Sequence, residues 1–233
     1  MKQIISFAFA LVVFSSCHRI QGSGNIIIET RSTGNFTGIS AGGAFEVELK
    51  TGPVTEVRIE ADDNLMPYIE TRVSGNVLNI TTKGHTNFID GHYKAYITAP
   101  NINYLNSSGA ASIRIMNVVK NSEKIKLESS GAASITGEVD APKIITEASG
   151  AANITISGRT MNYDAEASGS ANIKSAELMS ETTKVHVSGA ANAHVYSSVS
   201  LNADASGAAN VYYKGSGSTV VKTSGAANIK KDD

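Results

Sequence analysis

The sequence predicts an all-β protein: a parallel β-solenoid (β-helix-like) with about 18–22 residues per coil and irregular N-terminal capping coils. Three observations predict this fold. A short motif recurs at nearly constant intervals, small or apolar side chains alternate with charged ones around it, and small side chains greatly outnumber large ones. The 233 residues include 21 Gly but no Trp and only 6 Phe. We therefore expect a thin core between closely spaced strands.

The repeat is the motif Ser-Gly-Ala-Ala-Asn-Ile, with Ser, Ala or Val replacing individual residues in some copies. Its glycines stand 18 to 22 residues apart, at Gly109, Gly131, Gly150, Gly169, Gly189, Gly207 and Gly225. A unit of this length cannot bury an apolar face by itself and must stack on its neighbours.

Side chains around each glycine alternate in character. The fourth residue after it is usually Ile, and the second and fourth residues before it are small or apolar. The third residue before it is polar and mostly charged: Glu128, Glu147, Glu166, His186, Asp204 and Lys222. A period of two indicates β-strands, and the scarcity of Leu argues against a leucine-rich repeat. One coil per repeat then places parallel strands about 4.8 Å apart.

Two arrangements of the motif agree with this pattern. If the alternation continues through it, Gly and the second Ala face inward, and the Ser and Asn side chains form outward stacks. If Gly instead marks a corner, the Asn stack lies inside and satisfies backbone groups at a bend. The asparagines of that stack are Asn153, Asn172, Asn192, Asn210 and Asn228.

Residues 25–105 predict irregular N-terminal β coils that run continuously into the repeat region, residues 106–233. Strands are expected at 26–28, 45–49, 57–60 and 77–80, with turns at 51–53 and 74–76. Gly43-Ala44-Phe45 resembles a degenerate copy of the motif. Residues 62–66 predict a helical turn that Pro67 limits. We expect these coils and the tail from Lys230 to Asp233 to cap the two ends of the column.

The first 17 residues predict a lipoprotein signal peptide, followed by a short linker at 18–24. Lys2 gives a positive start, residues 4–14 are almost wholly apolar, and Ser15-Ser16 precede Cys17, the only Cys. This arrangement resembles a bacterial lipobox, although Phe14 stands where Leu is more usual. The alternative is an ordinary cleaved signal with an incidental Cys. The position of the only Cys favours lipidation of Cys17 and a membrane partner bound through that lipid.

Charge and motifs exclude several function classes. Twenty basic residues against 21 acidic ones argue against a nucleic-acid partner, because phosphate binding needs clustered Lys and Arg. With one Cys, no internal disulfide and no Cys-based zinc site can form. The sequence contains no nucleophile, zincin or nucleotide-binding motif, and residues 215–218 predict a flexible turn rather than a phosphate loop. We predict no cofactor.

Three groups of residues are candidates for chemistry. Glu128, Glu147 and Glu166 share a register that puts neighbouring carboxylates about 5 Å apart, as in a retaining glycosidase or a Ca²⁺ site. Solvated outward acids are the favoured interpretation. His186 and His194 would lie about 26 Å apart on an unbroken strand, too far for one metal ion. The three tyrosines near the C-terminus would form a glycan-stacking platform or cover the edge of the column: Tyr196, Tyr212 and Tyr213. We therefore predict no catalytic residue and no metal site, and the ligand-binding residues remain unknown.

A family resemblance follows from these residues. The leader, the segments GAFEV (43–47), ADDNLMPYIET (61–71) and GNVLNIT (75–81), and the repeated SGAANI units together resemble the GIN-domain family, described as auto-transporter adhesin heads. The resemblance covers nearly the whole mature chain. It implies a β-helix-like envelope protein and adhesion, and it carries no catalytic or ligand residues with it.

We therefore expect a non-enzymatic, lipid-anchored protein of the cell envelope, an outer-membrane lipoprotein that binds a glycan or an envelope protein through its column. One alternative is a structural or assembly component that faces the periplasm. Another is a carbohydrate-active β-helix enzyme. The residues after Cys17 form no acidic run of the kind that resembles some surface-export signals, so the sequence leaves the surface or periplasmic orientation open.

Overall fold

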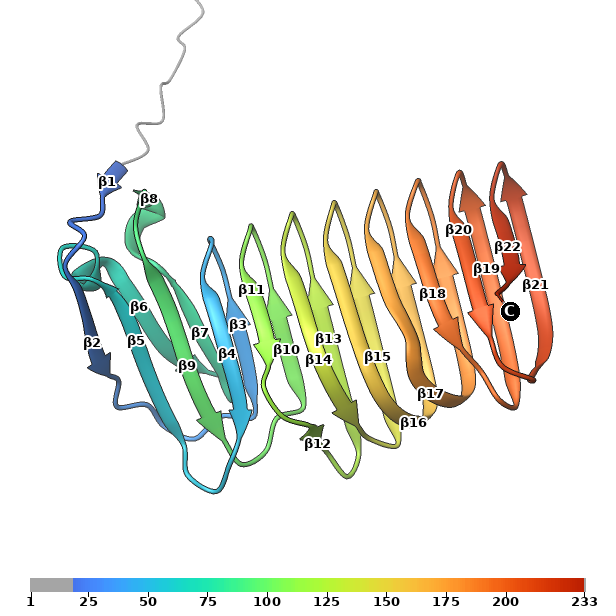
Figure 1. The fold of residues 1–233 in the computed structure, drawn as a ribbon, viewed down its shortest axis with the longest axis horizontal. Coiled ribbons are helices and arrows are strands. Elements are labelled where there is room, and N and C mark those ends of the chain that lie inside the picture. Colours follow the sequence, from blue (N-terminus) through green and yellow to red (C-terminus); the bar gives the residue numbers. More distant parts are fainter. Residues whose placement is uncertain (1–18, 233) are drawn as a thin grey trace, which may run out of the picture.

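Each repeat folds into one flattened coil, in which one strand runs to a sharp turn and a second strand runs back from it (Figure 1). The computed structural model describes residues 19–232, so the predicted signal peptide and Cys17 lie outside the described residues. About seven coils stack into a parallel β-solenoid, which confirms the predicted fold class. We call the sharp turn of each coil, centred on the repeat glycine, its tip.

Two sheets run along the column, one on each side of the tips. The sheet before the tips contains β3 (Gly38–Ala41), β10 (Tyr104–Ser107), β13 (Lys124–Ser129), β15 (Lys143–Ala148), β19 (Ser200–Gly207) and β21 (Ser218–Gly225). The sheet after the tips contains β4 (Glu46–Thr51), β11 (Ser112–Ile115), β14 (Ser134–Asp140), β18 (Asn192–Tyr196), β20 (Asn210–Lys214) and β22 (Asn228–Lys231). Two long strands bend from the second sheet into the first, β16 (Asn153–Ala167) and β17 (Asn172–Val187), and the short β12 (Val119–Lys120) pairs with the end of β14.

The tips hold glycine in a left-handed conformation and, from the second coil on, in close contact with the preceding coil. Gly131 has a φ of 77°, and a Cβ at that position would lie 2.7 Å from the carbonyl oxygen of Gly109 in the preceding coil. The N–H of the next residue, Ala132, donates to the same oxygen at 2.7 Å. This left-handed conformation and close backbone approach recur at the other repeat glycines. Gly43, in the predicted degenerate copy, is the first glycine of the row, because Ala110 donates to its carbonyl oxygen.

The asparagines after the tips form an outward ladder. Asn172 donates to the Asn153 side chain at 3.3 Å, and Asn192 and Asn210 donate to the preceding Asn at 3.1 and 3.0 Å. The Ala two residues after the repeat glycine, such as Ala152, is fully buried beside them in every copy but the last, where Ala227 is partly buried. Each of the two arrangements is therefore correct in part. The alternation continues with Asn outside, yet Gly lies exposed at a corner.

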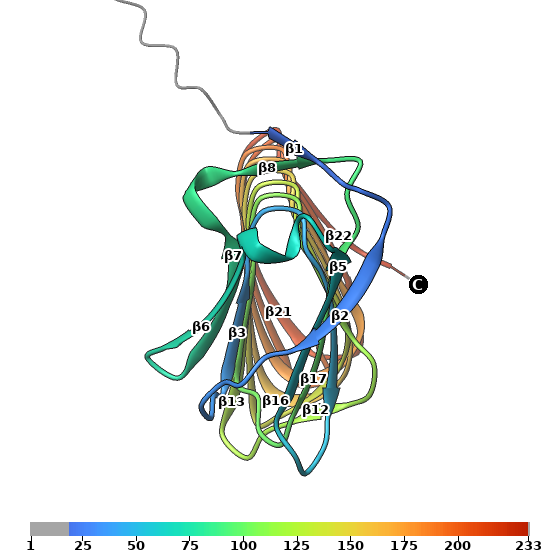
Figure 2. The ribbon, with the colours of Figure 1, turned by 90° about the vertical axis from the view of Figure 1, so that its left-hand side faces the viewer.

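The core is narrow, and most of its short strands bury two or three inward side chains, such as Ile125, Leu127 and Ser129 on β13. Ile135, Ile154 and Ile173 stack in register on one side, and small residues such as Ala165 and Ala203 face them from the other. Figure 2 shows the resulting flattened cross-section along the column. Tyr163 is the largest buried side chain, and its hydroxyl lies 2.9 Å from that of Thr146.

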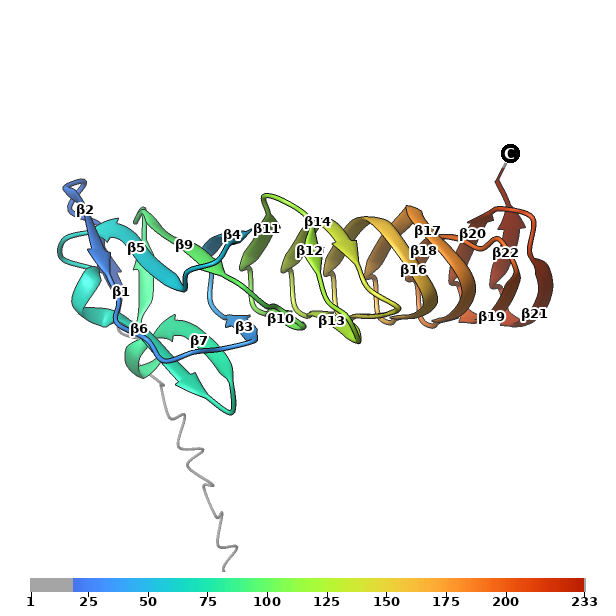
Figure 3. The same ribbon diagram turned by 90° about the horizontal axis from the view of Figure 1, so that it is seen from below.

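The N-terminal end is closed by strands that leave the coil pattern. These are β1 (Arg19–Gln21), β2 (Ile26–Thr30), β5 (Glu56–Asp62), β6 (Ile69–Ser74), β7 (Val77–Thr82), β8 (Asn87–Ile89) and β9 (Tyr93–Ala99), with the 3₁₀ turns η1 (Met66–Tyr68) and η2 (Lys83–His85). Pairing becomes antiparallel between β2 and β5, β5 and β9, and β6 and β7. Seen from below in Figure 3, these strands splay away from the regular column.

Aromatic rings fill the same end. Tyr93 makes edge-to-face contacts with Phe45 and Phe88, each at 5.0 Å between ring centroids. The strand predictions at 26–28, 45–49, 57–60 and 77–80 are confirmed. The predicted helical turn at 62–66 is confirmed in part: the N–H of Leu65 donates to the carbonyl oxygen of Asp62 at 3.0 Å, and the 3₁₀ turn η1 follows at Met66–Tyr68. Pro67 does not end the turn but lies inside η1, where its missing N–H costs no hydrogen bond.

A carboxylate clasp holds the first residues of the fold against this end. Buried Asp62 accepts hydrogen bonds from the backbone N–H of Gly24 at 2.6 Å and of His92 at 2.7 Å. Its neighbour Asp63 accepts hydrogen bonds from the side chains of Ser23 and Asn25. The bond from Ser23, followed by the bond from Asn25, lowers the pKa of Asp63. Within the predicted linker 18–24, the structure thus has strand β1 and a clasped turn.

The C-terminal end has no comparable cover among residues 19–232. β21 pairs with β19 and β22 with β20, and all eight residues of β21 are exposed. The described part of the tail does not cap this end, because Lys230 and Lys231 extend β22 along the edge of the last coil; Asp233 lies outside the described residues. No helix of the described chain is long and apolar enough to cross a membrane.

The glycine row makes a testable prediction. Gly131→Ala should destabilise the fold more than Gly43→Ala, although both residues have φ near 75°. At Gly43 nothing lies within 4 Å of the added methyl, so the variant should lose only the stability that left-handed strain costs, about 1–2 kcal/mol. At Gly131 the methyl also meets the Gly109 carbonyl oxygen. Urea unfolding of both variants measures the difference, and equal losses would refute the stacking argument.

Candidate functional site

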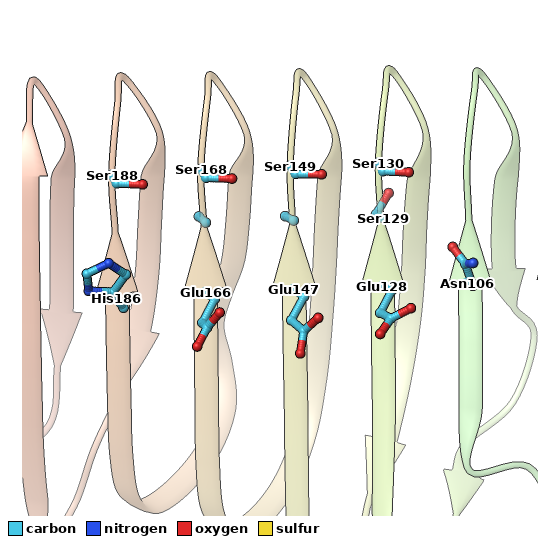
Figure 4. A pocket seen from close by; sticks show the side chains of 12 residues that line it. Asn106, Glu128, Ser129, Ser130, Glu147, Ser149, Glu166, Ser168, His186 and Ser188 are labelled. Carbon is cyan, nitrogen blue, oxygen red and sulfur yellow. The ribbon is translucent and has the colours of Figure 1, made fainter.

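The predicted acidic row forms a ladder on the sheet before the tips. Glu128 pairs in register with Glu147, and Glu147 with Glu166, on three successive coils. Asn106 and His186 extend the row at its two ends. Figure 4 shows one of these side chains on each coil, all on the same face. The predicted register is confirmed, and we call these five residues the polar ladder.

A shallow groove of about 400 Å³ runs along the polar ladder beneath the tips. Its upper wall is a row of serines, one per coil: Ser130, Ser149, Ser168 and Ser188. Carboxylates and hydroxyls therefore repeat together about every 4.8 Å. The groove is open to solvent along its length, so it presents a surface for an extended ligand rather than an enclosed pocket.

Lys126 neutralises the first two carboxylates. Its Nζ lies 2.5 Å from Glu128 and 2.8 Å from Glu147, so it bridges two coils. The hydroxyl of Tyr104, one coil earlier, donates to Glu128 at 2.5 Å. Lys126 and Tyr104 were not recognised from the sequence. Lys126 lies two residues before Glu128 and therefore on the same face of the strand, and Tyr104 pairs with Lys126 in register.

These contacts set the protonation of the group. Burial alone would raise the pKa of Glu128, but hydrogen bonds from Lys126 and then Tyr104 outweigh it, and its pKa is lowered. The same hydrogen bonds, first to Glu128 and then to Glu147, raise the pKa of Lys126. Burial, followed by the bond to Glu128, raises the pKa of Tyr104 to about 12. Glu128 is therefore ionised at neutral pH, the opposite of what a glycosidase general acid requires.

The third carboxylate differs from the first two. Glu166 makes no hydrogen bond or ion pair with any side chain in residues 19–232, and it lies between Glu147 and His186. Within the described chain, no group of three or more His, Cys, Asp and Glu side chains converges to hold a metal ion. The carboxylates repeat along a line instead of surrounding a point, which gives the Ca²⁺ interpretation no support.

The two histidines are not brought together. The tip at Gly189 places His186 on the sheet before the tips and His194 on the sheet after them. His186 lies 3.9 Å from Asp204, whereas His194 stacks on Tyr212 with 4.7 Å between ring centroids.

The three candidate tyrosines also do different things. Tyr212 faces outward in its stack with His194, while Tyr213 packs against the hydrophobic core. Tyr196 lines a second groove beside the turns opposite the tips. The structure therefore provides no single platform of three tyrosines.

A parallel β-solenoid with a polar ladder on one face belongs to the architectures that present long, regular surfaces. Residues 35–217 match the family model described as "Putative auto-transporter adhesin, head GIN domain". Because this match covers more than half of the chain, the protein belongs to the GIN-domain family, as its motifs indicated. No sequence among curated proteins matches it.

Solved structures share the fold at low sequence identity. A "putative adhesin" from Bacteroides fragilis is 21% identical, with a TM-score of 0.86 over 91% of this chain and 100% of that one. A "putative adhesin" from Parabacteroides merdae is 16% identical, with a TM-score of 0.76 over 93% and 100%. A "putative lipid binding protein" from Parabacteroides distasonis is 18% identical, with a TM-score of 0.75 over 92% and 100%. At these identities the likeness establishes the fold alone.

The Lys126 bridge predicts a pH-dependent contribution to stability. Since folding lowers the pKa of Glu128, its ionised form stabilises the folded state at pH values above 4.5, the ordinary pKa of a glutamate. This contribution is lost as the pH falls through the lower pKa of the folded state. Glu128→Gln should therefore cost about 1 kcal/mol or less at pH 7, since the pair is partly exposed.

Urea unfolding from pH 7 to pH 3 tests this prediction, and the difference from the wild type should shrink as the pH falls. Glu166→Gln, which removes an unpaired carboxylate from the same ladder, is the matched control and should change little. A loss at Glu128 that is independent of pH would contradict the assignment.

Proposed function

We propose that the protein is a non-enzymatic, lipid-anchored module of the cell envelope that acts as an adhesin or surface-binding protein. The observation that carries the proposal is the polar ladder on a rigid column, in a chain of the GIN-domain family. Family and fold neighbours carry adhesin or lipid-binding descriptions rather than enzymatic ones.

The groove suits a repeating ligand. A chain of sugars, or an extended segment of another envelope protein, offers hydrogen-bonding groups at regular intervals, as the ladder and its serine row do. Glu166 and His186, at one end of the groove, have the least engaged polar atoms and are the first contacts we assign to such a ligand. Association with an extended partner needs a stiff, preformed surface, because ordering it at binding would cost affinity.

The N-terminal end supports attachment to a membrane. The first strand, β1, begins at Arg19, two residues after Cys17, and pairs with β8. The Asp62 clasp then fixes the next turn to the body of the domain. A lipid on Cys17 would therefore hold the capped end of the column close to the outer membrane and leave the ladder accessible along its side.

Two alternatives remain distinguishable. A structural or assembly component would share the anchor and the column but face the periplasm. A carbohydrate-active enzyme would need a proton donor in the ladder, and the ionised state of Glu128 with its Lys126 partner argues against that role for the Glu128 and Glu147 pair.

The anchor predicts a clear fractionation result. Wild-type protein should sediment with membranes and leave them only with detergent, because a diacylated or triacylated Cys inserts hydrocarbon chains into the bilayer. Cys17→Ser should be released as soluble protein or retained with an uncleaved signal. Metabolic labelling with a palmitate analogue provides the direct readout, and labelled Cys17→Ser protein would refute lipidation at this residue.

The adhesin role predicts exposure at the cell surface. Protease added to intact cells should remove the column, with a periplasmic protein of the same cells as the protected control. Complete protection in intact cells, followed by cleavage after the outer membrane is opened, would assign the protein to the periplasmic alternative.

A further inference from the structure

The last coil of the column exposes side chains that every other coil buries. Val221 pairs in register with Ala203, which is fully buried, yet Val221 itself is 50% exposed. Ile229 on β22 is only partly buried, although its partner Val211 is fully buried. The inward-facing residues of this coil thus form a small apolar surface across the end of the column.

The same end carries unpaired backbone groups. The N–H of Ser218 donates to Val199 at 2.9 Å and that of Ala226 to Gly207 at 2.7 Å, both toward the preceding coil. Because backbone groups alternate sides along a strand, even-numbered residues of β21 point toward that coil. Thr219, Val221 and Thr223 therefore direct their N–H and C=O groups away from the column.

This edge has few of the features that prevent pairing. β21 is eight residues long, contains no Pro, and has a single charge, Lys222. Four of its eight residues are β-branched, a composition that favours strand pairing. Edge strands in soluble proteins are usually short, bulged or heavily charged.

We propose that two copies of the protein associate tail to tail through β21 and β22. A two-fold axis perpendicular to the sheets pairs β21 antiparallel with its own copy, and β22 with its copy. Both sheets then continue across the interface, and the exposed inward side chains of the two last coils cover each other. The N-terminal end ends in antiparallel strands and packed aromatic rings, so it offers no matching parallel coil to the open edge.

The charges on β22 are compatible with this symmetry. Lys230 and Lys231 are followed directly by Asp232, whose N–H still pairs with Tyr213 at 2.9 Å. Antiparallel pairing of β22 with its copy about Lys231 places Lys230 of one strand opposite Asp232 of the other. The charges of the tail therefore agree with the closed, two-fold arrangement.

The arrangement has a consequence that rests on the proposed lipid anchor. The two N-terminal ends lie at opposite poles of the dimer, so anchored copies that pair in this way belong to two different membranes. The proposal thus names the partner of the adhesin as a second copy of this chain.

Light scattering after size-exclusion chromatography tests the pairing with residues 18–233, which retain every described element. The expected result is a mass that rises from one to two protomers with concentration and does not rise further. Val221→Pro should abolish the rise, because proline removes an outward N–H and leaves the bonds to β19 intact. Unchanged melting of Val221→Pro would show that the column is still folded.

A matched pair of substitutions locates the interface. Val221→Lys should shift the midpoint of dimerisation to at least tenfold higher concentration, whereas Val199→Lys, at a 58% exposed valine between β18 and β19, should leave it unchanged. A monomer at all concentrations, a filament, or a dimer insensitive to both Val221 substitutions would each overturn the proposal.

An experiment with lipid vesicles tests the tail-to-tail pairing and the lipid anchor separately. Vesicles that carry the full-length lipidated chain should aggregate with one another, and those with Val221→Pro should not. If the wild-type chain fails to attach to vesicles, the anchor is wrong, while the dimer of residues 18–233 still stands. If it attaches but remains monomeric in solution and the vesicles stay dispersed, the tail-to-tail pairing is wrong and the anchor stands.

Discussion

The backbone contact between successive tips is the constraint on which the column depends. Each repeat glycine accepts a hydrogen bond from the residue after the next glycine, at 2.7 Å between Ala151 and Gly131, for example. That distance leaves no room for a Cβ and requires a left-handed turn, so glycine must recur once per coil. Because the turn is so tight, the two sheets lie close together, and alanine and isoleucine are enough to fill the space between them.

Strict stacking also explains why the chemistry of this protein lies on its surface. In a parallel column, a side chain has its counterpart directly above and below it, so any outward residue becomes a row. The asparagines use this geometry to form hydrogen-bonded ladders, which fix the register of the coils. A row of like charges would destabilise the same arrangement. Lys126 offsets that repulsion between Glu128 and Glu147 by bridging their coils.

The sequence predicted correctly those features of the fold and of the site that repeat from coil to coil. The glycine spacing determined the coils, and the fixed offset of Glu128, Glu147 and Glu166 placed them in register. The sequence did not predict contacts that occur at only one place in the chain. The reach of Tyr104 to Glu128 depends on a neighbour 24 residues away. Asp62 lies in the segment ADDNLMPYIET, but the sequence does not reveal the two backbone N–H groups that it accepts from. The structure combines the two predicted arrangements of the motif, with Gly at an exposed corner and Asn facing outward. This combination depends on turn geometry, which a two-residue alternation of side chains does not encode.

The two ends of a solenoid face the same problem, since a terminal coil has one side without a neighbour. At the N-terminus this protein solves it with strands that turn antiparallel and with the rings of Phe45, Phe88 and Tyr93. At the C-terminus of the described chain, inward positions of β21 stay exposed although their partners on β19 are buried: Thr219, Val221 and Thr223. The proposed pairing with a second copy would cover them. If the proposed anchor at Cys17 and the proposed pairing both hold, the capped end would be attached to the membrane and the open end would bind the second copy.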